Sequence, residues 1–178
     1  MNQKILIHSC CAPCSSSVFE NLLNKYSNIA GFFYNPNIHP EAEYKRRLEE
    51  YVRFAELMNY KIFIQEDPFE IWNDAVKGYE NEPERGKRCE ICFRLRLEKT
   101  AQFALKNDYN LFTTVLSVSP HKNSNLINKI GKETAKKYGI DFLEADFKKQ
   151  DGYKRGLKLS KKYGLYRQSY CGCKYSTK

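Results

Sequence analysis

The amino-acid sequence predicts an α/β fold with a mostly parallel, five-stranded sheet and helices on both faces of that sheet. Two observations predict it. Short apolar runs alternate with longer amphipathic runs along the chain, which is typical of βαβ units. No internal repeat or low-complexity linker divides the 178 residues, so residues 1–178 are expected to form a single domain. Hydrophobic residues make up 42% of the chain, which is sufficient for a packed core.

The first third of the chain alternates strand and helix. An apolar run predicts a strand over residues 4–8, and apolar residues at helical spacing predict a helix over 16–26. A second strand over 29–34 ends before an Asn-Pro pair. A long helix over 41–58 and a third strand over 61–65 follow, the strand with alternating apolar residues.

The rest of the chain continues the same alternation. The predicted elements are helices over 69–79 and 90–106, a strand over 111–116, a helix over 124–138, a strand over 140–143 and a basic helix over 153–163. A charged loop over 81–87 separates the helix over 69–79 from the helix over 90–106. Gly139 and Gly164 follow the last two helices, at the position where glycine commonly ends a helix.

The charge balance favours an anionic partner. The chain carries 30 Lys and Arg against 21 Asp and Glu, a formal net charge of +9. Such a balance suits nucleic acid, a nucleotide or a membrane surface, although a merely basic protein has the same composition. No apolar run approaches the ~20 residues that span a bilayer, and the N-terminus lacks the pattern of a signal peptide. We therefore expect a cytoplasmic protein without a membrane partner.

Seven cysteines fall into three tight groups, a pattern that indicates metal or redox chemistry in a reducing compartment. The groups are Cys10, Cys11 and Cys14; Cys89 and Cys92; and Cys171 and Cys173. The first group directly follows the first predicted strand. In parallel sheets ligands bind at the carboxyl ends of the strands, and the start of the next helix favours thiolates.

Several kinds of site could use these thiols. Buried core cysteines have no reason to cluster. A structural zinc site suits Cys89, Cys92, Cys171 and Cys173 but leaves three thiols over. A redox pair of Cys11 and Cys14, able to form a disulfide, leaves four. The full set suits an iron–sulfur cluster together with a second metal or a redox pair.

Five segments together resemble the QueH family, the cobalamin-independent epoxyqueuosine reductases. They are HSCCAPCSS, YNPNIHP, GKRCEICFRLRLEKTA, TTVLSVSPHK and FKKQDGYKRGLKLSKKYGLYRQSYCGC. The resemblance runs from Ile5 to Cys173. It implies a Rossmann-like fold of the adenine-nucleotide α-hydrolase group, with the metal site at the carboxyl ends of the strands. It also implies reduction of epoxyqueuosine to queuosine in the anticodon loop of tRNA with a GUN anticodon.

The resemblance further implies a 4Fe–4S cluster beside a mononuclear metal, with iron as the expected ion. The residues that it places at these metals are Cys10, Cys11, Cys89, Cys92, Cys171 and Cys173. Some members carry an aspartate near Cys14, so Cys14 is expected to be a softer ligand or a neighbour of the metal. The basic, cysteine-containing tail, about residues 148–178, would then complete the site. The spacing leaves open which thiols hold the cluster and which hold the single metal.

The chemistry requires electrons, protons and a bound tRNA. Opening the epoxide to an alkene takes two electrons, which no side chain supplies, so an unidentified low-potential donor is expected. The candidate proton donors are His8, His39, His121, Asp151, Tyr153 and Tyr170. The residues predicted to bind tRNA phosphates are Lys154, Arg155, Lys158, Lys161 and Arg167, with a solvated helix face as the alternative. Arg85, Lys87, Arg88, Arg94 and Arg96 flank the middle cysteine pair similarly.

Two other functions compete with this interpretation. A tRNA-thiolation enzyme of the PP-loop type shares the fold, but it needs a glycine-rich turn to hold ATP phosphates. The corresponding turn here, HSCCAPCSS, has no glycine, so no use of ATP is expected. The alternative outside the enzymes is a zinc-stabilised RNA-binding module.

Overall fold

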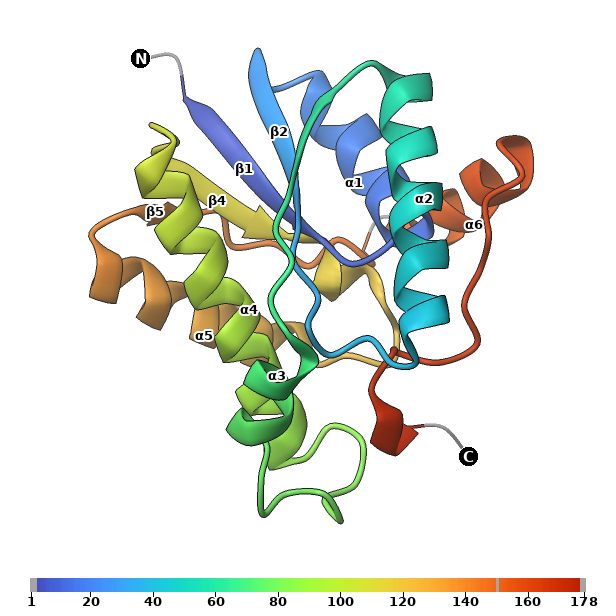
Figure 1. The fold of residues 1–178 in the computed structure, drawn as a ribbon. Helices are drawn as coiled ribbons and strands as arrows, with labels where there is room; N and C mark the ends of the chain where they lie inside the picture. The colour runs from blue at the N-terminus through green and yellow to red at the C-terminus, as the bar shows by residue number, and fades with distance from the viewer. Residues whose placement is uncertain (1–2, 150, 177–178) are drawn as a thin grey trace.

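The computed structural model describes residues 3–149 and 151–176, and a five-stranded sheet lies at its centre (Figure 1). The strands are Lys4–Ser9 (β1), Asn28–Phe33 (β2), Lys61–Ile64 (β3), Leu111–Thr114 (β4) and Asp141–Phe142 (β5). Their spatial order is β3-β2-β1-β4-β5, and all four pairings are parallel. The carboxyl ends of all five strands therefore meet at one edge of the sheet.

Helices cover both sides of the sheet, as the sequence predicts. They are Ala12–Leu23 (α1), Glu41–Met58 (α2), Phe69–Ala75 (α3), Lys87–Lys106 (α4), Ser124–Tyr138 (α5) and Gly152–Lys162 (α6). Two short 3-10 helices span Val115–Val118 (η1) and Lys174–Ser176 (η2). Helix α1 packs against α2 and α6 on one side, and α4 packs against α5 on the other (Figure 1). The predicted fold class is confirmed.

The strand order places a switch point between β1 and β4. From β1 the chain proceeds through β2 to β3 in one direction, and it later returns to β4 and β5 on the other side. Connections that leave in opposite directions open a crevice at the carboxyl ends of the two central strands. The first cysteine group follows β1, so it lies at this crevice.

The central strand is buried on both faces, as parallel strands with helices on each side generally are. Ile5, Leu6 and Ile7 have no exposed surface. Next to β1, a side chain at Gly31 would collide with the Tyr51 ring of α2. Close approach at this glycine lets the Tyr51 hydroxyl donate a hydrogen bond to the Ser9 hydroxyl, at 3.0 Å. Helix α2 is thereby tied to the end of β1, next to the cysteines.

Two element boundaries near the site differ from the prediction. Helix α1 begins at Ala12, four residues earlier than predicted, because Pro13 is well accommodated in a first helical turn. Cys14 therefore belongs to the helix rather than to the preceding loop. The strand predicted to reach residue 116 ends at Thr114, whose hydroxyl accepts a hydrogen bond from the Leu116 amide at 3.2 Å. That bond turns the chain into η1.

The remaining differences concern element ends. Helix α4 starts three residues before its predicted start, α3 stops four residues before its predicted end, and β5 contains two residues. None of these differences changes the order of the elements.

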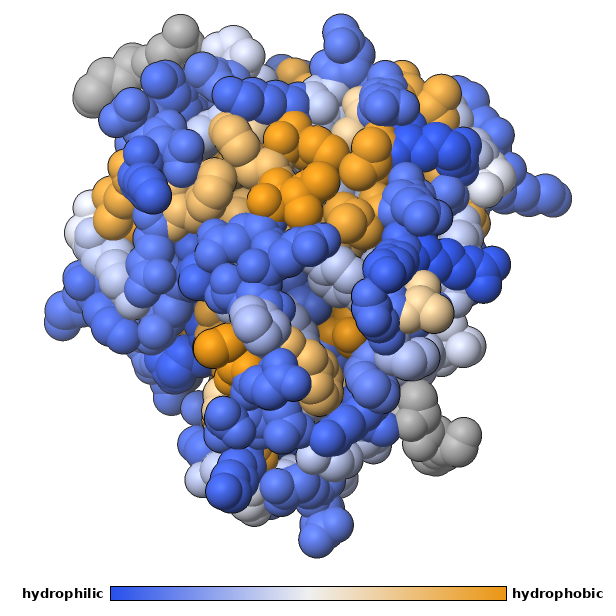
Figure 2. All heavy atoms as spheres, in the orientation of Figure 1, coloured by the Kyte–Doolittle hydropathy of each residue, from blue (hydrophilic) through white to orange (hydrophobic). Residues whose placement is uncertain are grey.

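The face drawn in Figure 2 is mainly hydrophilic, with a larger apolar area above and a smaller one below. Figure 2 shows hydrophobic side chains gathered on the upper part of the face drawn in Figure 1. Strand β3 forms an edge of the sheet, and its Ile64 is 44% exposed. Among the described helices, none combines the length and the apolar character needed to cross a membrane.

Candidate metal centre

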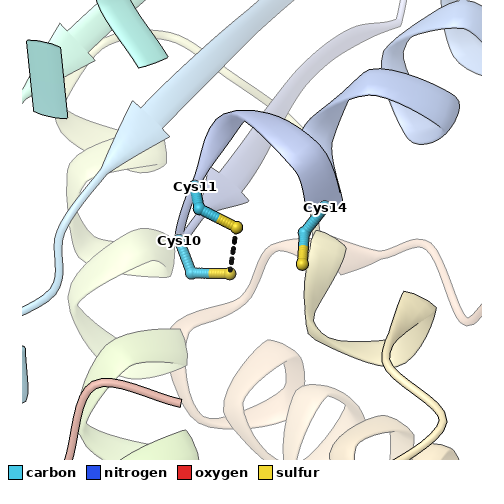
Figure 3. Close-up of side chains that lie close together, drawn as sticks. All are labelled: Cys10, Cys11 and Cys14. Carbon is cyan, nitrogen blue, oxygen red and sulfur yellow. Dashed lines mark hydrogen bonds between the residues drawn. The ribbon is translucent and has the colours of Figure 1, made fainter. Parts of the chain in front are cut away.

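The first cysteine group gathers three thiols at the end of β1. Cys10 and Cys11 follow the strand, and Cys14 lies in the first turn of α1. The sulfur atoms all lie within 4.8 Å of one another, and those of Cys10 and Cys11 are 3.8 Å apart. Figure 3 shows the three side chains directed toward a common space. Cys10 and Cys11 are buried and Cys14 is partly buried, and all three are free thiols.

The three thiols differ in the direction in which their pKa is shifted. Hydrogen bonds from the Cys11 and Cys14 thiols to the Cys10 sulfur hold the pKa of Cys10 well below its usual range, against the effect of burial. The same bond to Cys10 raises the pKa of Cys11 to about 12, and the pKa of Cys14 is raised well above its usual value. A bound cation would favour ionisation of all three, because thiolates are the form that ligates metals.

A cavity of about 380 Å³ brings the other cysteine groups to the same place. Its lining includes Cys14, Cys89, Cys92, Cys171 and Cys173. The middle pair comes from the first turns of α4, and the last pair comes from the C-terminal tail. Three cysteine groups that are far apart in the sequence thus meet at the carboxyl edge of the sheet.

The thiols of Cys171 and Cys173 also shift each other's pKa in opposite directions. A hydrogen bond from the Cys173 thiol lowers the pKa of Cys171 to about 5, and the same bond raises the pKa of Cys173. Cys173 is buried with Cys92 against Trp72. Burial raises the pKa of Cys89. All seven cysteines, which lie within the described residues, are free thiols, so the suggested Cys11–Cys14 disulfide is not formed in this structure.

A buried guanidinium group lies beside these thiols. Arg96 is 3% exposed, and its Nη1 atom lies 3.9 Å from the Cys92 sulfur. Its Nη2 donates to Asn35 Oδ1 at 2.6 Å, and its Nε donates to His8 Nε2 at 3.3 Å. The side-chain partners found for Arg96 in the described part of the chain include no carboxylate. A buried cation with neutral partners is costly unless an anion lies nearby, and the thiolates supply that anion.

Lys122 adds a second positive charge to the cavity. It lines the cavity, and Cys10 and Cys171, the two thiols whose pKa is lowered, act electrostatically on its ammonium group. Burial alone would lower the pKa of Lys122, but these thiolates outweigh burial and raise it. Lys122 follows η1 in an irregular loop, at the end of the TTVLSVSPHK segment, and it is not among the site residues predicted from the sequence.

The candidate proton donors lie in three different places: in the cavity lining, at the surface and in the core. His121, Tyr153 and Tyr170 line the cavity, whereas His39 and Asp151 are exposed and do not. His8 has no exposed surface, and burial, reinforced by the charge of Arg96, lowers its pKa to about 3. His8 is therefore neutral and oriented within the core, where its Nδ1 lies 2.9 Å from the Thr114 hydroxyl.

The basic residues predicted to bind RNA lie on α6 and beyond it. Lys154, Lys158 and Lys161 are exposed, and Arg167 lines the cavity. Another face of α6 also contributes to the cavity lining. Arg155 differs from the others, because its guanidinium group forms a two-point ion pair with Glu20 of α1, at 2.5 and 2.6 Å. That pair makes Arg155 a contact between two helices.

The arginines around the middle cysteine pair do not form a phosphate-binding surface as a group. Arg88 and Arg96 are 2% and 3% exposed. The Arg88 guanidinium group donates to the carbonyl groups of Tyr79 and Glu80, at 3.2 and 2.8 Å, and so holds the preceding loop. On the exposed side of α4, Arg94 pairs with Glu133 at 2.8 Å, and Lys87 pairs with Glu90 at 3.2 Å.

Comparison with known families gives a consistent match. A family model described as epoxyqueuosine reductase QueH matches residues 5–178. Relatives named epoxyqueuosine reductase QueH include a protein of Streptococcus pyogenes, 43% identical over 98% of this chain and 70% of its own length. The Acinetobacter baylyi protein is 44% identical over 97% of this chain and 80% of its own. The Thermotoga maritima protein is 40% identical over 97% and 89%.

Solved structures with the same fold have much lower sequence identity. A U34-tRNA thiolase, NcsA from Methanococcus maripaludis with its [4Fe-4S] cluster, has a TM-score of 0.57 at 14% identity, over 100% of this chain and 63% of its own. A predicted tRNA methyltransferase subunit from Methanocaldococcus jannaschii has a TM-score of 0.56 at 16% identity, over 88% and 74%. At these identities the likeness concerns the fold alone, and it agrees with the five-stranded parallel sheet and flanking helices described above.

Proposed function

This chain belongs to the epoxyqueuosine reductase QueH family, and we propose that it reduces epoxyqueuosine to queuosine in the anticodon loop of tRNA. The observation that carries the proposal is the convergence of three cysteine groups on one cavity at the carboxyl edge of the sheet. We further propose that the substrate is tRNA with a GUN anticodon. Such a substrate places the enzyme in the cytoplasm.

The thiols fit the metal groups that this reaction needs. Sulfur donors select iron–sulfur clusters and other thiophilic metals, and free thiols beside Arg96 and Lys122 form a site that tolerates a negatively charged centre. We propose that the seven cysteines, together with the tail that begins near residue 148, hold a 4Fe–4S cluster and a mononuclear iron. When bound, these groups supply electrons singly and a Lewis acid for the epoxide oxygen.

The protein's own residues bind the substrate and handle protons. Conversion of the epoxide to the alkene consumes two electrons and two protons, and it releases the oxygen as water. His121 and Tyr153 line the cavity, so they are the candidates to donate a proton to the released oxygen. The Tyr170 hydroxyl already donates to the His39 carbonyl. The raised pKa of Lys122 keeps its ammonium group protonated, so it can attract a negatively charged group in the cavity.

A PP-loop-type thiolation enzyme is the alternative with the same fold. The segment after β1, CCAPC, contains no glycine, whereas ATP-dependent enzymes of this type need glycine there to approach phosphates. The buried Cys10 and Cys11 occupy this position. We therefore propose that the reaction proceeds without ATP and takes its electrons from a low-potential donor.

The direct test is an anaerobic assay with tRNA that contains epoxyqueuosine. Protein reconstituted with iron and sulfide, plus a low-potential reductant, is expected to yield a nucleoside lighter by one oxygen atom, without added cobalamin or ATP. Mass spectrometry of the digested tRNA measures the product, and iron and sulfide analysis measures the metal content. A brown, iron-replete protein that forms no such product would contradict the proposed reaction. Stoichiometric zinc without sulfide would favour the RNA-binding module.

We propose that the exposed lysines of α6, together with Arg167, bind tRNA phosphates next to the cavity. Changing Lys154, Lys158 and Lys161 to Gln is expected to weaken tRNA binding at moderate salt. The slope of log affinity against log salt should also become shallower, by about 0.7–0.9 for each phosphate that the variant no longer neutralises. Binding titrations at several salt concentrations measure both effects.

A matched control is available on the opposite side of the sheet. Changing the exposed Lys129, Lys132 and Lys136 of α5 to Gln removes the same charge from a helix that lies away from α6 (Figure 1). Equal decreases in affinity in the two triple variants would indicate that net charge, and not this face of α6, determines binding. Arg155 is left unchanged because of its ion pair with Glu20.

A further inference from the structure

We propose that Arg47 of α2 is the positioning residue for Cys171 and Cys173, because it holds the backbone of the C-terminal tail where both thiols reach the cavity. The inference rests on the proposed function in that these two thiols belong to the metal site. Its test, however, reads thiol exposure and needs neither metal nor substrate.

The segment that carries these cysteines, residues 163–173, is here called the C-terminal strap. It leaves α6 and descends beside α2 to the lower end of that helix (Figure 1). Along this path the strap forms one wall of the cavity, through residues 167–171 and 173. The position of the strap therefore determines both the shape of the cavity and the place of two thiols.

Charged side chains at helical spacing fasten the upper part of the strap to α2. Arg53 donates to the Tyr163 carbonyl at 3.1 Å, and Glu50 accepts the Tyr166 amide at 2.8 Å. Nearer the start of α2, Glu43 accepts the Tyr166 hydroxyl at 2.9 Å. Side chains three to four residues apart lie on one face of a helix, so α2 presents a continuous polar face to the strap.

Arg47 ends this series next to the cysteines. Its side chain is 1% exposed, and its Nε pairs with Glu43 at 2.6 Å. Nη1 donates to the Cys171 carbonyl and Nη2 donates to the Tyr170 carbonyl, both at 3.1 Å. A planar guanidinium group with donors in a fixed fork can hold two successive carbonyl groups, which a lysine cannot do.

The backbone around Gly172 makes this contact close. Gly172 has φ +106, a conformation that favours glycine, and an added side chain would lie 3.2 Å from Arg47 Nη1. The Gly172 carbonyl also accepts the His39 amide at 2.8 Å. The strap is thus pressed against α2 at the residue between the two cysteines.

Few apolar side chains anchor the strap. Within residues 163–173, the buried hydrophobic residues are Leu165 and Cys173. Polar contacts therefore contribute much of what holds the segment, and Arg47 makes two of them, to the carbonyl groups of Tyr170 and Cys171. Its removal would leave two carbonyl groups without these donors, which favours local opening of the strap over unfolding of the sheet.

The test is site-resolved alkylation of the full-length chain, without reconstitution with iron and sulfide. In the Arg47→Lys variant, Cys171 and Cys173 are expected to react with iodoacetamide at least about tenfold faster than in the wild type, as removal of a charge-assisted hydrogen bond implies. Cys89, which lies on α4 and not on the strap, should keep its wild-type rate. Peptide mass spectrometry resolves the individual cysteines, and circular dichroism monitors the fold.

The control is Arg53→Lys, the same substitution on the same helix at the other end of the strap. It should leave the reactivity of Cys171 and Cys173 within about twofold of the wild type, because Arg53 is partly exposed and contacts only the start of the strap. Wild-type rates at Cys171 and Cys173 in Arg47→Lys would overturn the proposal. A parallel rise at all seven cysteines would also overturn it, because it would indicate general destabilisation.

Discussion

Replacing Cys10 by serine is expected to abolish epoxide reduction while leaving the sheet folded. Hydrogen bonds with the Cys11 and Cys14 thiols lower the pKa of Cys10, so Cys10 is the thiol of this group that ionises most readily. A serine hydroxyl at this position stays protonated at neutral pH and is a poor ligand for thiophilic metals. Iron content should fall together with product formation in the anaerobic assay, by more than about 100-fold for the latter.

The control for this variant is a measurement of its secondary structure. Serine is close to cysteine in size, so far-ultraviolet circular dichroism of Cys10→Ser should match that of the wild type. Ser17→Ala, a buried substitution on the helix α1 that follows Cys10, should retain both iron and activity. Full activity and full iron content in Cys10→Ser would exclude Cys10 from the metal site.

Replacing Arg96 by methionine is expected to make the proposed metal centre release its iron faster without unfolding the protein. The guanidinium group bridges Cys92 on α4 and Asn35 beyond β2, and it brings a positive charge next to the cysteine sulfur atoms of the proposed metal site. Hydrogen bonds that involve charged groups contribute about 1.5–3 kcal/mol. Iron release to a chelator should therefore become about 10- to 100-fold faster in Arg96→Met than in the wild type.

The stability of the metal-free protein should respond much less. Methionine removes the cost of burying a charge, but it leaves the Asn35 side-chain carbonyl without its donor, and these two effects oppose each other. The free energy of unfolding is expected to stay within about 2 kcal/mol of the wild type by urea titration. Arg94→Met, on the exposed side of the same helix, should change neither quantity. If Arg96→Met releases iron at the wild-type rate, Arg96 has no electrostatic role at the centre.

Arg96 also illustrates where reasoning from the sequence falls short. Arginine is usually exposed, so the sequence favours a phosphate-binding surface around Cys89 and Cys92. In the structure Arg88, Cys92 and Arg96 lie four residues apart on the inward side of α4, and both arginines are buried. The four-residue spacing between an arginine and a cysteine is a signal in the sequence that identifies this face.

The order of strands and helices, and the place of the first cysteine group, follow from the sequence by itself. Apolar periodicity locates the elements, and a parallel sheet brings groups that follow its strands to one edge. The start of α1 required the structure, because Pro13 is compatible both with a loop and with a first helical turn.

Only the tertiary structure decided which distant groups meet. The C-terminal strap reaches the cavity because α2 binds its backbone through Arg47, Glu50 and Arg53, and Lys122 faces the thiolates because the loop after η1 passes the same crevice. Local sequence determines periodicity and chain turns, since these depend on neighbouring residues. Contacts between segments more than 100 residues apart depend on how the packed helices and strands orient those segments. A pattern of neighbouring residues does not predict such contacts.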